Sequence, residues 1–172
     1  FFKISYGSKP RAAAGYFFSI LLGLLTKLDH SEIKSEEIAQ AIEQLRESQH
    51  KLRPEQDLDN NLAKQIALKI GDRIPLIIGS LTSKGVAQRL KQQFNLNSKT
   101  SAFFDQLPEA IHNTLIGLEL PKELAQKLFV ILIQSVFADE MQKQYDRVVF
   151  EMLERQRIEY ESLLVDPQSS QI

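Results

Sequence analysis

Two short, uninterrupted apolar runs constrain the fold of this chain most strongly. The first runs from Ile74 to Gly79 and ends in Ser80, and the second runs from Phe129 to Val136 and is rich in β-branched residues. Such runs are typical of strands in a parallel sheet, where helices cover both faces and no polar alternation is needed. Segments with helical spacing of apolar residues alternate with them. We therefore predict an α/β fold, a parallel sheet with helices on both faces.

The remaining elements follow from caps, breakers and spacing. A third strand is expected at 113–118, so that the sheet has three strands, and 95–108 is expected to be a connection. Helices are expected at 10–29, from an N-cap at Ser35, at 62–71, at 83–94, from Pro121, and at 139–165. The apolar density of 10–29 predicts a helix buried on most sides. The expected core side of the last helix comprises Met141, Tyr145, Val148, Met152 and Leu153.

The length of 172 residues suits one domain with a single core. We expect residues 1–172 to form a single, partial domain, with a helical lead-in at 10–70 and an α/β core at 71–172. The chain starts without Met and stops where another βα unit would begin, so we expect it to be a piece of a longer protein that lacks its final βα elements. The apolar stretch 12–25 is shorter than the roughly 20 residues that cross a bilayer.

Charge and cysteine content exclude several classes of function. Lys and Arg total 21 and Asp and Glu total 22, which gives a net charge of −1. Such a chain has no overall basic field to attract nucleic acid or anionic lipid, so neither partner is expected. Without cysteine it has no disulfide and no thiolate metal site, which fits a cytoplasmic location.

The loop after the first strand is the first candidate site, because ligands bind at the carboxyl ends of strands in open α/β sheets. It contains Ser80, Thr82, Ser83 and Lys84 and enters a helix, where backbone N–H groups can hold an anion. The glycine and lysine spacing is not that of a P-loop. A plain strand-to-helix turn, with hydroxyls as caps, explains the same residues.

His112 is the one histidine of three at the mouth of an expected strand, flanked by Glu109 and Asn113. It is a candidate acid or base, and a hydrogen-bonded structural histidine is the alternative. No metal site is expected, because no two histidines are close in sequence.

Several motifs in order resemble one family. They are the segment Pro10–Tyr16, the strand 74–79, the helix and turn Gly85–Lys99, the aromatic pair Phe103-Phe104, and Leu107–Asn113 with its His112. These are similar to the second half of the bifunctional phosphoglucose/phosphomannose isomerases, members of the sugar isomerase (SIS) superfamily. The resemblance implies an SIS-type three-layer α-β-α sandwich.

The resemblance also implies an activity, the interconversion of glucose 6-phosphate or mannose 6-phosphate with fructose 6-phosphate. It implies no metal or nucleotide cofactor, a homodimer, and an N-terminal SIS domain in the same parent chain. A family glutamate moves the proton between C1 and C2, and a histidine of the neighbouring subunit helps to open the sugar ring. His112 matches that histidine, whereas Leu96 stands at the position of the glutamate.

A leucine cannot accept a proton, so three functions remain open. The chain is half of an active isomerase, with His112 and, as a substitute base, Glu109; or it is an inactive sugar-phosphate-binding or regulatory SIS protein; or it is a dimerisation module. The candidate substrate-binding residues are Arg11, Ser80, Lys91 and Asn113.

Overall fold

The computed structural model describes residues 7 and 9–165. The chain forms two units, Phe1–Leu45 and Arg46–Ile172, which are described separately. The first contains a 3-10 turn η1 (Pro10–Ala12), helix α1 (Ala14–Lys27) and most of helix α2 (Ser35–Lys51). The second contains the parallel sheet.

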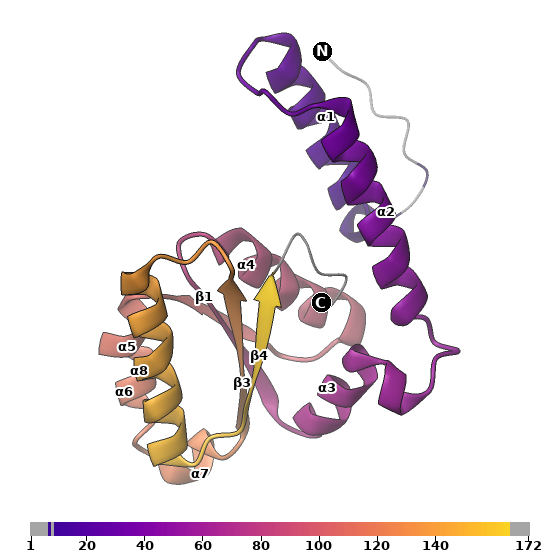
Figure 1. The fold of residues 1–172 in the computed structure, drawn as a ribbon. Coiled ribbons are helices and arrows are strands. Elements are labelled where there is room, and N and C mark those ends of the chain that lie inside the picture. Colours follow the sequence, from indigo (N-terminus) through magenta and orange to yellow (C-terminus); the bar gives the residue numbers. More distant parts are fainter. Residues whose placement is uncertain (1–6, 8, 166–172) are drawn as a thin grey trace. The chain divides into compact units, whose positions relative to one another are not determined.

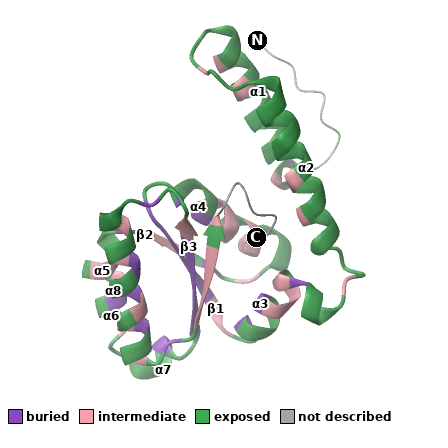
Figure 2. Cartoon of the chain, viewed as in Figure 1, coloured by how far each residue is buried: buried purple, intermediate pink, exposed green. Residues whose placement is uncertain are grey.

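Helix α1 forms where the sequence predicts a helix, but the expectation that it is buried on most sides is wrong. None of its residues is buried, and Phe17 and Phe18 are 58% and 66% exposed. Figure 2 shows both α1 and α2 almost entirely in the exposed class. Each of the two helices in this unit has only one helix beside it, so most of its surface stays exposed. A high density of apolar residues in α1 is therefore not sufficient to bury it within this unit.

Helix α2 starts one residue earlier than its expected cap implies. Ser35 is the first helical residue, and the backbone N–H of Lys34 donates to Glu37 Oε2 at 2.7 Å. This is the return bond of a capping box, in which an acidic side chain three residues along satisfies the N–H of the cap. Lys34 therefore holds the cap position in place of Ser35.

Four parallel strands form one sheet in the order β2-β1-β3-β4. Their bounds are β1 Ile74–Gly79, β2 Phe103–Gln106, β3 Leu128–Ser135 and β4 Tyr160–Val165. The centre is the β1–β3 pair, in which Ile77 lies opposite Ile131. The α/β class and both apolar strand runs are confirmed.

Helices cover both faces of this sheet, as Figure 1 shows, with α8, α5 and α6 on one side and α3 and α4 on the other. Their bounds are α3 Leu62–Ile70, α4 Lys84–Gln93, a π-helical turn η3 Phe94–Ser98, α5 Glu109–His112, α6 Thr114–Gly117, α7 Lys122–Ala125 and α8 Glu140–Gln156. The predicted helices at 62–71, at 83–94 and after Pro121 are confirmed.

Alternate residues of the central strands fill two separate apolar clusters. Val130 and Leu132 of β3 pack towards α8, whereas Phe129 and Ile131 pack towards α3 and α4. A strand has this double burial because successive side chains point to opposite faces. The unbroken apolar runs in the sequence are its direct cause.

Two sequence assignments around the edge strands are wrong. The segment 113–118, expected as a strand, contains helix α6 and its two caps. The strand β2 lies earlier in the chain, within the segment 95–108 that was expected to be a connection. The side-chain oxygen of Asn113 accepts from the N–H of Thr114 and so caps a helix there. The prediction from local apolar content therefore assigned a strand to residues that form a helical turn.

The last helix is shorter than expected. It ends at Gln156, Arg157 adopts a left-handed conformation with φ 57°, and β4 follows. The buried side of α8 is Asp146, Val149 and Leu153, with Tyr145 and Met152 partly buried. Two expected core residues, Met141 and Val148, are exposed, because the helix turns them away from the sheet.

Gly79 allows α4 to pack closely on the end of β1. A Cβ at position 79 would lie 2.6 Å from the Cβ of Ala87 and 3.3 Å from the carbonyl oxygen of Ser83. Real Cβ atoms do not approach so closely, so the start of α4 would have to move. Glycine here sets how α4 sits on the sheet.

We expect Gly79→Ala to destabilise the fold by about 1–3 kcal/mol, because overpacking forces a backbone shift. Adding Ala87→Gly should recover part of the loss, since it removes the clashing atom. Urea unfolding of both variants measures this. Gly85→Ala is the matched control, because nothing lies within 4 Å of its added Cβ. An equal loss in the control would contradict the packing explanation.

Asp146 is a buried carboxyl with incomplete hydrogen bonding. Gln134 Nε2 donates to its Oδ2 at 2.9 Å, and Ser162 donates to Gln134 in turn. Its Oδ1 is buried and has no partner among the described residues. Burial raises the pKa of Asp146, and the bond from Gln134 opposes that rise.

Because its pKa is raised in the folded state, Asp146 keeps its proton to a higher pH when the chain is folded. Its contribution to stability is therefore fully present below the ordinary pKa range of Asp and is lost as pH rises through the pKa of the folded state. We expect Asp146→Asn to be more stable than the wild type at neutral pH, by about 1–3 kcal/mol, because an unpaired buried charge is avoided. The difference should shrink on acidification. Chemical denaturation across pH measures it, and exposed Glu151→Gln on the same helix should not reproduce the pattern.

Candidate functional site

The carboxyl ends of the four strands share one edge of the sheet because all strands are parallel. After β1 the chain passes towards β2, and after β3 it passes the other way to β4. The connections therefore diverge at the carboxyl ends of β1 and β3. This position is the topological switch point, the usual ligand site of open α/β sheets. The 80–83 loop and the start of α8 flank it.

A chain of hydrogen bonds crosses this switch point. Gln142 Nε2 on α8 donates to Ser80 Oγ at 2.5 Å, Ser80 Oγ lies 3.0 Å from Ser83 Oγ, and Ser83 Oγ donates to the carbonyl oxygen of Ile133 at 2.8 Å. The backbone N–H of Ser80 also donates to Ser83 Oγ at 2.9 Å. Ser80 and Ser83 are buried, so their hydroxyls fix the loop against β3 and α8.

The same loop leaves fewer groups for a ligand than its sequence suggests. Thr82 is exposed, with bonds to Ser80 and Gln142 of 3.3 Å or longer. The N-termini of α4 and α8 both lie at this edge, and Asp139 Oδ1 already accepts from the N–H of Gln142. The buried hydroxyls of this turn therefore have a structural role. This is the alternative interpretation that the sequence offered beside an anion site.

The second candidate group lies at the same edge, directly after β2. Glu109 begins α5 and His112 ends it, so both side chains belong to one helical turn. Asn113 Nδ2 donates to Glu109 Oε1 at 3.0 Å, and Thr114 Oγ1 donates to the carboxylate of Asp105 on β2. Asn113 thereby orients the Glu109 carboxylate, and Asp105 ties the following turn to the sheet.

His112 and Glu109 are both exposed. An imidazole and a carboxylate in one turn can exchange protons with a substrate that docks on this surface, if they come within hydrogen-bond reach of its reacting atoms. Ser80, Glu109, His112 and Asn113 thus share the carboxyl edge. Lys91 lies near the end of α4, away from the N-terminal end that faces this edge, and Arg11 belongs to the first unit.

Leu96 lies in η3, on the chain that enters β2, whereas His112 lies on the chain that leaves it. The four residues of β2 span roughly 13 Å. The strand therefore holds the two positions at opposite ends. A π-helical turn is uncommon and frequently occurs at functional positions, and here its Leu96 is 40% exposed.

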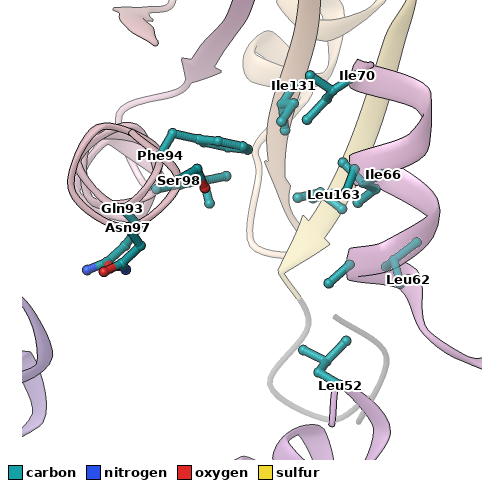
Figure 3. Close-up of a pocket in the computed structure, with 13 residues that line it drawn as sticks. Leu52, Leu62, Ile66, Ile70, Gln93, Phe94, Asn97, Ser98, Ile131 and Leu163 are labelled. Carbon is teal, nitrogen blue, oxygen red and sulfur yellow. The ribbon is translucent and has the colours of Figure 1, made fainter. Parts of the chain in front are cut away.

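An apolar cavity of about 390 Å³ lies beside that π-helical turn, and Figure 3 shows it between α3, the turn and the sheet. Apolar side chains of α3, β3 and β4 line it, among them Ile66, Ile131 and Leu163. Gln93, Asn97 and Ser98 supply its polar groups, and no charged side chain lines it. Sequence reasoning missed this cavity, because its walls come from five elements spread along the chain, α3, α4, η3, β3 and β4. It lacks the cations that a phosphate group requires.

The described residues, 7 and 9–165, contain neither a candidate metal cluster nor a candidate membrane-spanning helix. No cluster of three His, Cys, Asp or Glu side chains there could hold a metal ion. None of the helices in this range has both the length and the apolar character to cross a bilayer.

Comparison with known proteins identifies relatives for most of the chain. Residues 59–170 match the family of the bacterial phospho-glucose isomerase C-terminal SIS domain. A bifunctional phosphoglucose/phosphomannose isomerase of Caldicellulosiruptor bescii is 35% identical over 133 residues, which cover 77% of this chain and 39% of that protein. The protein of the same name from Aquifex aeolicus is 31% identical over 132 residues, 77% of this chain and 37% of that protein.

The chain thus spans about two fifths of the length of these curated relatives. A crystal structure of a glucose-6-phosphate isomerase like protein from Thermus thermophilus matches with a TM-score of 0.66 and 22% identity, over 86% of this chain and 48% of that one. This match establishes the SIS-type fold. The resemblance that the sequence motifs indicate is confirmed.

We expect Ser83→Ala to destabilise the fold by about 1–3 kcal/mol, because it leaves the buried carbonyl of Ile133 and the N–H of Ser80 without partners. Thr82→Ala, which removes an exposed hydroxyl from the same loop, should change stability by less than about 0.5 kcal/mol. Urea unfolding compares the two. Equal stabilities would show that the hydroxyl of Ser83 does not fix the loop.

Proposed function

The chain belongs to the family of the bacterial phospho-glucose isomerase C-terminal SIS domain, and on this basis we propose that it is the C-terminal half of a sugar-phosphate aldose–ketose isomerase. The substrates are glucose 6-phosphate or mannose 6-phosphate, and the product is fructose 6-phosphate. The relatives that match carry this bifunctional name.

The observation that carries the proposal is the turn after β2. It brings a histidine and a carboxylate to the carboxyl edge of the sheet, with the carboxylate held by Asn113. Ring opening needs a group that gives a proton to the ring oxygen and one that takes a proton from the anomeric hydroxyl, and an imidazole can do both near neutral pH. We assign this step to His112.

The proton transfer between C1 and C2 needs a carboxylate held against a C–H bond. Leu96 cannot provide it. Glu109 is the carboxylate that shares a helical turn with His112, so we propose it as the substitute base, with Asn113 as its positioning residue and as a contact for the substrate. Ser80, Lys91 and Arg11 remain proposed substrate contacts.

The position of Leu96 and His112 at opposite ends of β2 supports a dimeric site. A substrate next to the η3 turn of one chain can meet a histidine only if that histidine comes from elsewhere. We propose that His112, together with Glu109 of the same turn, serves the site of a second copy in a homodimer, and that an N-terminal SIS domain of the same parent chain completes it. The proposed location is the cytoplasm, and no metal or nucleotide cofactor takes part.

Leu96 also supports a second candidate function, a sugar-phosphate-binding protein without isomerase activity. In this case the edge residues bind or sense the ligand, and no base completes the reaction. Binding without turnover distinguishes it, because a ligand that binds the folded state raises thermal stability.

The test is a coupled isomerase assay with fructose 6-phosphate on the intact protein that contains this chain. We expect turnover in the parent and a loss of at least about 100-fold in kcat for His112→Ala, since general acid–base groups contribute about 10²–10⁴-fold. Glu109→Gln should cause a similar loss if Glu109 is the base.

Leu96→Glu is the informative companion variant. A parent without turnover that gains activity with Leu96→Glu, and is stabilised by sugar phosphate, would establish the binding function instead. A parent that neither turns over nor binds any sugar phosphate would contradict both candidates and leave the dimerisation module.

A further inference from the structure

A second cavity, of about 770 Å³, lies at the amino edge of the sheet. One wall is the segment from Leu118 to Gln126, which leads into β3, and the other is the end of α8, residues 155–157, which leads into β4. Both walls precede strands, whereas His112 follows one. The cavity is therefore separate from the His112 turn. It is also separate from the η3 turn, because Ala125 in its wall packs in the apolar cluster beside α8, whereas Phe94 of η3 packs in the cluster on the other face of the sheet.

The charges around this cavity are mainly positive. Lys122, Arg155 and Arg157 line it together with one carboxylate, Glu119. Arg155 pairs with Glu119 at 2.9 Å. Within the described residues, the side chains of Lys122 and Arg157 have neither an ion pair nor a hydrogen bond to another group. Two cations are thus available to a ligand, in a chain whose net charge is −1.

The walls are held in place by bonds of their own. Gln126 Nε2 donates to the carbonyl oxygen of Arg157 at 3.3 Å, and Gln156 Nε2 donates to the carbonyl oxygen of Leu115 at 3.0 Å. The backbone N–H of Arg157 closes α8 by donating to the carbonyl oxygen of Glu154. The N–H of Gln126 donates to the carbonyl oxygen of Lys122 at 3.2 Å. The backbone that carries Lys122 and Arg157 is therefore held before any ligand arrives, which lowers the entropy lost on binding.

We propose that this cavity is a binding site for a small phosphate ester or a similar dianionic oxyanion. A guanidinium offers two parallel N–H donors that match two phosphate oxygens, and a lysine adds a point charge. The volume lies in the range of small-molecule sites, which favours a compact ligand over an extended acidic chain. The inference does not depend on isomerase activity, because no residue that lines this cavity is among the proposed catalytic or substrate-binding residues.

The first experiment is a titration of the 172-residue chain with inorganic phosphate, followed by amide NMR, with sodium chloride at equal ionic strength as the reference. We expect saturable shifts in residues 118–126 and 155–157. Absence of saturation, or shifts centred on 80–83 or 109–113, would overturn the proposal. Neither result bears on turnover, so the two proposals fail independently.

Charge-removing variants of similar length then test the cations. Lys122→Gln should weaken phosphate binding by roughly tenfold, the effect of losing one hydrogen bond to a charged group, and Arg157→Gln by at least as much, because its guanidinium offers two donors. Lys127→Gln is the matched control, since Lys127 is a neighbouring cation that does not line the cavity. Equal weakening in the control would show that phosphate responds only to overall charge, and would overturn the site.

Discussion

The parallel pair of β1 and β3, buried on both faces, is the constraint on which the rest of the α/β unit depends. Six register pairs join the two strands, from Ile74 with Leu128 to Gly79 with Ile133. A slip by one residue would exchange the side chains that face the two apolar clusters, so burial on both faces fixes the register. Once it is fixed, the ends of the two strands, and the loops that leave them, have no freedom to move apart.

The carboxyl edge inherits its geometry from this pair. Gly79 allows α4 to approach β1, and Ser83 bonds across to Ile133 of β3, so the loop between them is held by packing on one side and by a buried hydroxyl on the other. Gln142 extends the same bonds to α8. A loop held in this way can present backbone and hydroxyl groups with little reorganisation, which is what a binding edge requires.

The two positions that the family resemblance links to catalysis, Leu96 and His112, lie at opposite ends of β2. His112 follows the strand and Leu96 precedes it, so a short strand with a fixed direction decides that these two positions cannot meet at one end. The proposal of a site shared between two copies follows from this separation. The charged cavity at the amino edge lies outside that site, and its cations belong to the connections that enter β3 and β4.

The sequence by itself determined the central strands, the helices that alternate with them, and the segment around His112, because these depend on local apolar runs, caps and a motif. It could not identify β2 and β4, whose residues are less buried and which exist as strands through pairing with β1 and β3. It mistook 113–118 for a strand, because apolar content does not distinguish a short strand from a helical turn. Tertiary structure alone decided that α1 is exposed, that Ser83 bonds to Ile133 of β3, and that Leu96 and His112 lie apart. Each of these depends on which segments distant in the sequence lie side by side, and a local pattern carries no information on that.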